Sequence, residues 1–212
     1  MADDLQLGPA ETVAGKPFTD PVHSRNEEAA LRQLLVHERE RARPWTGKEV
    51  EVVVRETDGE GLRHLLVVPD TGRLLEAENP TVVGFFGRPR EDADVPLLFE
   101  LEEELIAGMA AYGSSGGLLS YYDVELVHGA YGNLILFASP QGVDVWRENP
   151  VHRRAVEISP GNYHEIRLHL GQLEGRLLDG GTLHLKRTRY LDYSGSEIWR
   201  AIRPVLALDE PG

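Results

Sequence analysis

The sequence predicts a protein of the α+β class, in which helices pack on one face of an antiparallel sheet. Two observations lead to this prediction. Several short segments are rich in β-branched and apolar side chains and alternate in polarity, as strands do. Two longer segments carry apolar residues at helical spacing, and each lies between two of these strands along the chain.

Composition excludes several classes of protein. With 35 acidic and 22 basic residues the net charge is −13, which disfavours binding to nucleic acid. The chain has no cysteine, so disulfides, thiolate metal sites and a cysteine nucleophile are excluded. No stretch approaches the length of a membrane span, and the residues after Met1 do not resemble a secretory signal. We therefore expect a cytoplasmic protein without a membrane or nucleic-acid partner.

The first part of the chain is expected to contain an arm and a small subdomain. Residues 1–25 are rich in glycine and proline and poor in large apolar side chains, which is typical of a flexible arm. Residues 26–79 are expected to form a helix plus β-hairpin subdomain that ends near Asn79. Its expected elements are a helix over 27–43 capped near Asn26, strands 49–56 and 63–68, and a short extended piece over 73–78.

Residues 80–212 are expected to form the main domain. Their order, β-α-β-β-α-β with one further strand, is the ferredoxin-like arrangement, an antiparallel sheet with both helices on one face. The other face then needs a cover, so we expect a homodimer that pairs sheet to sheet. The expected elements are strand 81–88, a helix over 97–112 capped at Asp94, strands 118–127 and 133–138, a helical segment over 140–159 that Pro150 either interrupts or divides by beginning a second segment and that Pro160 ends, and strands 163–170 and 183–192.

One passage of this domain resembles a known superfamily. Asn133-Leu-Ile-Leu-Phe137, followed by Trp146 and His152, is similar to the strand-then-helix passage of dimeric α/β-barrel proteins, such as antibiotic-biosynthesis monooxygenases and EthD-like proteins. The resemblance covers roughly residues 81–193. It implies a homodimer with a cavity between sheet and helices that holds a small molecule. Because some members bind haem, it also implies haem as an alternative cofactor.

Two groups of residues are candidates for catalysis. Strict alternation places Glu165, Arg167 and His169 on one strand face, where Arg167 could hold an anionic oxygen while His169 exchanges a proton. The same row could instead be a ladder of salt bridges between subunits. His152 follows Trp146 by six residues on the second helical segment. It could be a general base, a haem ligand or a surface histidine.

The expected function follows from these candidates and from absent motifs. No HExxH, G-x-G-x-x-G, P-loop or G-x-S-x-G motif is present, so we expect no metal, dinucleotide or serine nucleophile. We expect an enzyme that acts without a cofactor on an apolar or aromatic small molecule, by proton transfer or oxygenation. The alternatives are a haem-binding member of the superfamily and a non-enzymatic, ligand-binding or stress-type dimer. The residues expected to bind substrate are Tyr121, Asp123, Trp146, Tyr163 and Glu165.

Overall fold

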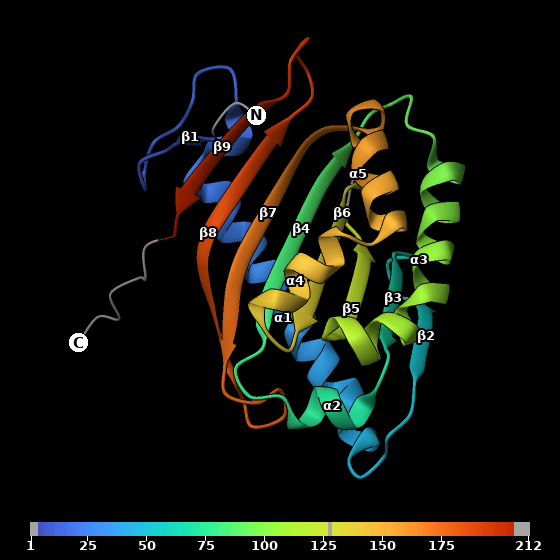
Figure 1. The fold of residues 1–212 in the computed structure, drawn as a ribbon. Helices are drawn as coiled ribbons and strands as arrows, with labels where there is room; N and C mark the ends of the chain where they lie inside the picture. Colours follow the sequence, from blue (N-terminus) through green and yellow to red (C-terminus); the bar gives the residue numbers. More distant parts are fainter. Residues whose placement is uncertain (1–3, 127–128, 206–212) are drawn as a thin grey trace, which may run out of the picture.

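The computed structural model describes residues 4–126 and 129–205, without the side chains of residues 110–115. In this part the chain builds a single nine-stranded sheet, in the order β1-β9-β8-β7-β4-β6-β5-β3-β2 (Figure 1). Neighbouring strands are antiparallel, except that β1 is parallel to β9. The strands are β1 (Leu5–Gln6), β2 (Val52–Thr57), β3 (Arg63–Val68), β4 (Thr81–Pro89), β5 (Leu118–Glu125), β6 (Tyr131–Phe137), β7 (Tyr163–Glu174), β8 (Thr182–Asp192) and β9 (Trp199–Pro204).

Helices lie on both faces of the sheet. The long helix α1 packs on one face, and α3, α4 and α5 pack on the other (Figure 1). The α+β class is therefore confirmed. Among the described residues, no helix combines the length and the apolar character needed to span a membrane. The helices are α1 (Pro21–Ala42), α2 (Thr71–Glu76), α3 (Val95–Gly116), α4 (Pro140–Arg147) and α5 (Pro150–Asn162), with 3-10 turns at Pro17–Thr19 and Arg43–Trp45.

The sheet is larger than the one predicted from the sequence. Strands β7, β4, β6 and β5 are adjacent, α3 connects β4 to β5, and α4 with α5 connects β6 to β7. The sheet does not stop at these strands or at β8. The β2–β3 hairpin pairs with β5, and β9 and β1 extend the opposite side. An unpaired strand edge offers free backbone N–H and C=O groups, so the remaining segments of the chain add to it.

Helix α1 covers the sheet face that was predicted from the sequence to be uncovered. Leu31 fills the space above Gly84 of β4, where an added Cβ would lie 2.6 Å from Cδ1 of Leu31. Leu34 and Leu35 pack beside Leu31 in the same apolar cluster, which also contains Phe86. Burial of such side chains stabilises the fold by roughly 1.5–3 kcal/mol each. The uncovered face from which a homodimer was predicted is thus occupied by the chain's own helix.

The N-terminal segment packs against the sheet and is not a flexible arm. Helix α1 begins at Pro21, not near Asn26, because Asp20 accepts a hydrogen bond from the backbone N of Val22 and proline is favoured in the first turn. Leu7 and Phe18 are buried against β8 and β9. The flexible arm predicted over residues 1–25 therefore contains a strand, a 3-10 turn and the start of a helix.

Arg203 of β9 holds this segment in place. It is 3% exposed, and it donates hydrogen bonds to the carbonyl oxygens of Gly8 (3.3 Å), Glu11 and Thr19 (2.6 Å). A fourth hydrogen bond joins Arg203 Nη1 to the hydroxyl oxygen of Tyr190 at 2.6 Å. The buried guanidinium is thus satisfied by backbone oxygens of the N-terminal segment, as a buried charge requires.

Local signals were correct at some element ends and wrong at others. The cap of α3 at Asp94, which accepts from the backbone N of Leu97 at 3.1 Å, and the start of α5 at Pro150 are confirmed. The extended piece predicted over 73–78 is instead the end of helix α2, which Asp70 caps. Helix α5 continues through Pro160 to Asn162, because a proline in the last turn removes only one backbone hydrogen bond.

Candidate functional site

A cluster of polar side chains lies between the sheet and α3, in a layer that is otherwise apolar. Asp123 of β5 stands at its centre and is 5% exposed. Its neighbours across the strands are Leu65 of β3 and Asn133 of β6, which therefore point to the same face. An acidic side chain at such a position is costly to bury unless donors surround it.

Each carboxylate oxygen of Asp123 accepts a hydrogen bond. Nη2 of Arg63 donates to Oδ2 at 2.7 Å, and Nδ2 of Asn133 donates to Oδ1 at 2.6 Å. The same amide of Asn133 also donates to the hydroxyl oxygen of Tyr121 at 2.9 Å. Three neighbouring strands therefore contribute to one connected network.

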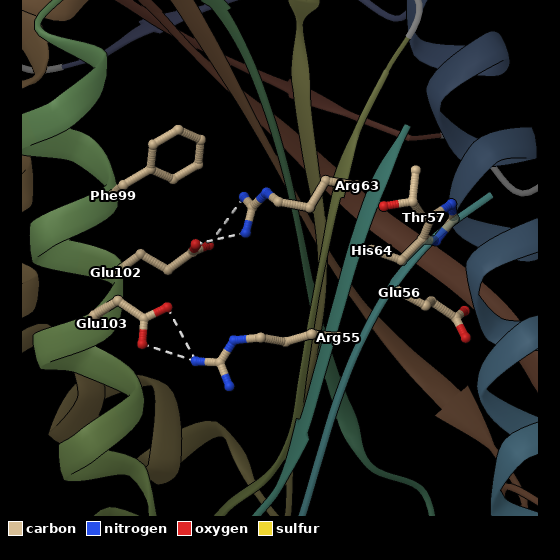
Figure 2. A pocket seen from close by; sticks show the side chains of 8 residues that line it. All are labelled: Arg55, Glu56, Thr57, Arg63, His64, Phe99, Glu102 and Glu103. Carbon is tan, nitrogen blue, oxygen red and sulfur yellow. Dashed lines mark hydrogen bonds and ion pairs between the residues drawn. The ribbon is translucent and has the colours of Figure 1, made fainter. Parts of the chain in front are cut away.

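Arg63 is shared by two carboxylates. Besides Asp123, it binds Glu102 of α3, with 2.7 Å between Nη1 and Oε2. Its guanidinium also lies over the ring of Phe99, 4.9 Å from the centroid. Figure 2 shows Arg63 reaching from the sheet toward Glu102 and Phe99 on α3. One cation thus faces two acids, which leaves one negative charge unbalanced when both acids are ionised.

A pocket of about 350 Å³ opens beside this cluster, between the β2–β3 hairpin and α3 (Figure 2). Arg63 and Glu102 form part of its wall, and Asp123 lies directly behind Arg63. A second ion pair, between Arg55 and Glu103 at 2.7 Å, crosses the same space. The remaining lining residues are Glu56, Thr57, His64 and Phe99.

Burial and a neighbouring acid change the proton affinity of Asp123. Burial raises the pKa of Asp123 to about 8, and the negative charge of Glu102 adds to this effect. Arg63 and Asn133 oppose the rise only in part. An acid that titrates near neutrality can both give and take a proton, which is the property that acid–base catalysis requires.

Tyr163 lies on the same side of the sheet. An added Cβ at Gly87 of β4 would lie 2.6 Å from Cε1 of Tyr163, so only glycine leaves room for the ring. The ring also contacts Phe85, with 5.8 Å between centroids. Burial raises the pKa of Tyr163, and the charge of Asp123 raises it further. Tyr163 therefore stays a neutral phenol near the cluster.

Trp146 and His152 pack beside this layer without reaching the pocket. Trp146 is buried in the apolar cluster under α3 and α4, with its ring 6.3 Å from that of Tyr121. The ring of His152 lies 5.6 Å from that of Trp146. Burial, and then the charge of Arg147, lowers the pKa of His152 to about 4, so its imidazole is neutral. His152 lines neither the pocket beside Arg63 nor the one on the α1 face of the sheet. A haem bound in either pocket would therefore not meet the His152 imidazole.

The other predicted residues lie on the opposite face of the sheet. His169 of β7 pairs with Gly84 of β4, so Glu165, Arg167 and His169 point toward α1. There they meet Glu27 of α1, which the sequence analysis did not select. The predicted set is therefore divided by the sheet: Tyr121, Asp123 and Tyr163 lie on one side, and the row on β7 lies on the other.

Glu27 joins this row to α1. It accepts a hydrogen bond from Nε of Arg167 and lies 2.8 Å from Nε2 of His169. Nδ1 of His169 lies 2.9 Å from the hydroxyl oxygen of Thr188, and Nη1 of Arg167 also binds Glu165 at 3.3 Å. The predicted row of ion pairs therefore exists, but its partner is a helix of the same chain.

Sequence reasoning also missed Arg63 and Glu102. Arg63 alternates with Leu65 and Val67 on one strand face, so a charged residue continues an apolar row. Glu102 follows Leu98 by four residues, at the border of the apolar stripe of α3. A charged side chain on an otherwise apolar face could have indicated both residues. This pattern does not show, however, that Arg63 and Glu102 bind each other.

Comparison of the chain with protein-family models, curated proteins and solved structures finds no match. Within residues 4–126 and 129–205, no group of three or more histidine or acidic side chains is placed to hold a metal ion.

Proposed function

We propose that the chain is an enzyme that moves protons on a small molecule bound beside Arg63 and Glu102. The observation that carries this proposal is the sharing of Arg63 between Asp123 and Glu102 at the wall of a pocket. Burial, and then the negative charge of Glu102, raises the pKa of Asp123 to about 8 despite the opposing charge of Arg63. Strongly shifted pKa values beside a pocket are concentrated at functional sites, so this shift favours a catalytic role.

The chemistry follows from the groups present. Asp123 itself does not line the pocket, but its carboxyl group is hydrogen-bonded to Glu102, which does. A proton can therefore pass between Asp123 and a substrate oxygen or carbon through the carboxylate of Glu102. Arg63 can hold the negative charge that develops on substrate oxygen, because its guanidinium already lines the pocket. These groups support proton transfer rather than oxygenation.

The lining of the pocket indicates the class of substrate. Arg55, Arg63, Glu102 and Glu103 are charged, and Phe99 supplies an aromatic wall. A volume of about 350 Å³ is at the small end of the range for ligand sites. We therefore propose a small polar substrate instead of the apolar or aromatic one that the sequence suggests.

The resemblance to dimeric α/β-barrel proteins is compatible with this site. We infer that β7-β4-β6-β5, with α3, α4 and α5 on one face, form a ferredoxin-like unit within the larger sheet. The proposed site would then lie between the sheet and its helices, where the resemblance implies a ligand cavity. A homodimer remains part of that resemblance, although α1 already covers the face that would pair.

A titration of Asp123 tests the basis of the proposal. Carbon-13 NMR of the carboxyl groups should show one aspartate titrating near pH 8 that disappears in Asp123→Asn. Asp144→Asn, which changes an exposed carboxyl, is the matched control and should leave this resonance unchanged. Titration of Asp123 near the usual value of 3.8 would remove the basis of the proposal.

A second experiment tests the activity. Dihydroxyacetone is a small polar ketone, and its carbon-bound protons exchange with deuterated water when a base removes them. The protein should speed this exchange, with a rate that rises as pH increases through about 8. Asp123→Asn should lower the rate by about 100-fold, and Asp144→Asn should not. Binding of the ketone without exchange would favour a non-enzymatic ligand-binding protein.

A further inference from the structure

A second pocket, of about 210 Å³, lies on the α1 face of the sheet and is separated from Asp123 by the sheet itself. Helix α1 contributes side chains at positions i, i+3, i+4 and i+7, which share one helical face. From α1 the pocket receives His23, Asn26, Glu27 and Ala30, and Arg167 and Phe86 line it from the sheet.

The acid in this pocket is already fully used. Oε1 of Glu27 accepts from Arg167, and Oε2 lies 2.8 Å from Nε2 of His169. Glu27 is 9% exposed. Both of its oxygens are therefore committed to the sheet, and the carboxylate is not available to bind a cationic ligand.

The donors in the pocket are not all used. Arg167 binds Glu27 through Nε and Glu165 through Nη1, while its Nη2 has no hydrogen-bond partner among the described residues. The side chains of Asn26 and His23 likewise have no hydrogen-bond partner in the described part of the chain, and both are exposed. Arg167, whose side chain is 12% exposed, thus lines the pocket beside an amide and an imidazole.

Other lining residues of the pocket are apolar. The ring of Phe86 is 2% exposed overall and is fixed against His169, with 5.6 Å between the ring centroids. Leu126 and Ala30 extend this surface. The pocket lining therefore combines a cationic donor with apolar side chains.

We propose that this pocket binds a small organic anion, whose carboxylate would accept from Nη2 of Arg167 and from Asn26 while its apolar part packs against Phe86 and Leu126. Arg and carboxylate form strong, charge-assisted hydrogen bonds. Only Nε of Arg167 contacts α1, through Glu27, and Nη1 binds Glu165 on the same strand. Ligand binding at Nη2 and helix docking therefore do not compete for the same donor.

Benzoate is a suitable probe because it joins one carboxylate to an apolar ring, and benzamide is its uncharged analogue. Isothermal titration calorimetry should detect benzoate binding at millimolar concentration. Benzamide should bind about tenfold more weakly, since it lacks the charge that Arg167 recognises.

The variant Asn26→Asp gives the sharpest test. It places a negative charge at the exposed mouth of the pocket without touching the contacts that dock α1, so it should weaken benzoate binding by about tenfold. Gln33→Glu is the matched control, because it adds the same charge to an exposed site two turns further along α1. It should leave the affinity unchanged.

Three results would overturn the proposal: no benzoate binding at millimolar concentration, equal binding of benzoate and benzamide, or equal affinity in Asn26→Asp and Gln33→Glu. Asp123→Asn should bind benzoate normally, because Asp123 lies on the other face of the sheet. Failure of the proposed acid–base site would therefore leave this result unaffected.

Discussion

Nε2 of His169 lies 2.8 Å from Oε2 of Glu27, so a fully buried histidine of β7 is joined directly to helix α1. The same carboxylate accepts from Arg167, and Thr188 binds the other ring nitrogen of His169. The polar row that the sequence predicts at this strand face therefore stabilises the contact between α1 and the sheet. Substitutions in this row should therefore change the folding stability of the single chain rather than the strength of a subunit interface.

Arg167→Ala should lower the free energy of unfolding by about 3–5 kcal/mol, because it leaves Glu27 and Glu165 buried without their shared cation. Urea unfolding measures this change. Arg88→Ala is the comparison, since the exposed Arg88 also binds Glu165 but should cost less than about 1 kcal/mol. Similar costs for the two variants would show that burial does not decide the contribution.

Glu38→Gln should change the pH dependence of stability. Glu38 is fully buried on α1, and burial raises its pKa to about 7 from 4.5 in the unfolded chain. Between these values the folded protein retains a proton that the unfolded chain has lost, so stability falls as pH rises and levels off above about 7.

The side chain of the variant cannot ionise. As the pH rises from 4.5 to above 7, the free energy of unfolding of the variant should therefore increase by about 3 kcal/mol relative to that of the unmodified protein. Melting temperatures of both proteins across this range give the comparison. Parallel curves would mean that Glu38 titrates normally.

Phe18→Ala should destabilise the protein by about 3–5 kcal/mol, although it lies in the segment that the sequence suggests is an arm. Phe18 is buried and contacts the rings of Tyr190 and Trp199. Leu5→Ala, at a residue that is 49% exposed in the same segment, should have little effect. Thermal unfolding of both variants tests whether the segment is packed. An unchanged melting temperature in Phe18→Ala would indicate that it is loose.

Light scattering at micromolar concentration should give the mass of one chain. The homodimer was predicted from an uncovered sheet face, and α1 buries that face through Leu31, Leu34 and Leu35. Without an exposed apolar face, the main reason for pairing is lost. A measured dimer would show that another surface pairs, and the unpaired edge of β2 is the first candidate.

Local signals in the sequence were sufficient for most elements. Asp94 before Pro96 predicts the start of α3, and Pro150 predicts the start of α5, because caps and prolines act within a few residues. Strands β1 and β9 were missed, since Leu5–Gln6 is too short for a pattern and Trp199–Pro204 has none of the regular alternation of β7. Their pairing depends on partners distant in the chain.

The sequence by itself determined the class of the fold, the order of its central elements and the common face of Glu165, Arg167 and His169, because strand alternation is a local property. Only the tertiary structure decided that Asp123 points to the other side. That relation depends on the register of β7 with β4, of β4 with β6 and of β6 with β5, which places His169 and Asp123 on opposite faces.

The tertiary structure also decided which groups meet. Glu27 reaches Arg167 and His169, and Glu102 reaches Arg63, only after helices pack on the two faces of the sheet. Contacts between residues so far apart in the chain are fixed by which face each helix covers, and side-chain pattern along a single segment carries no information about that choice.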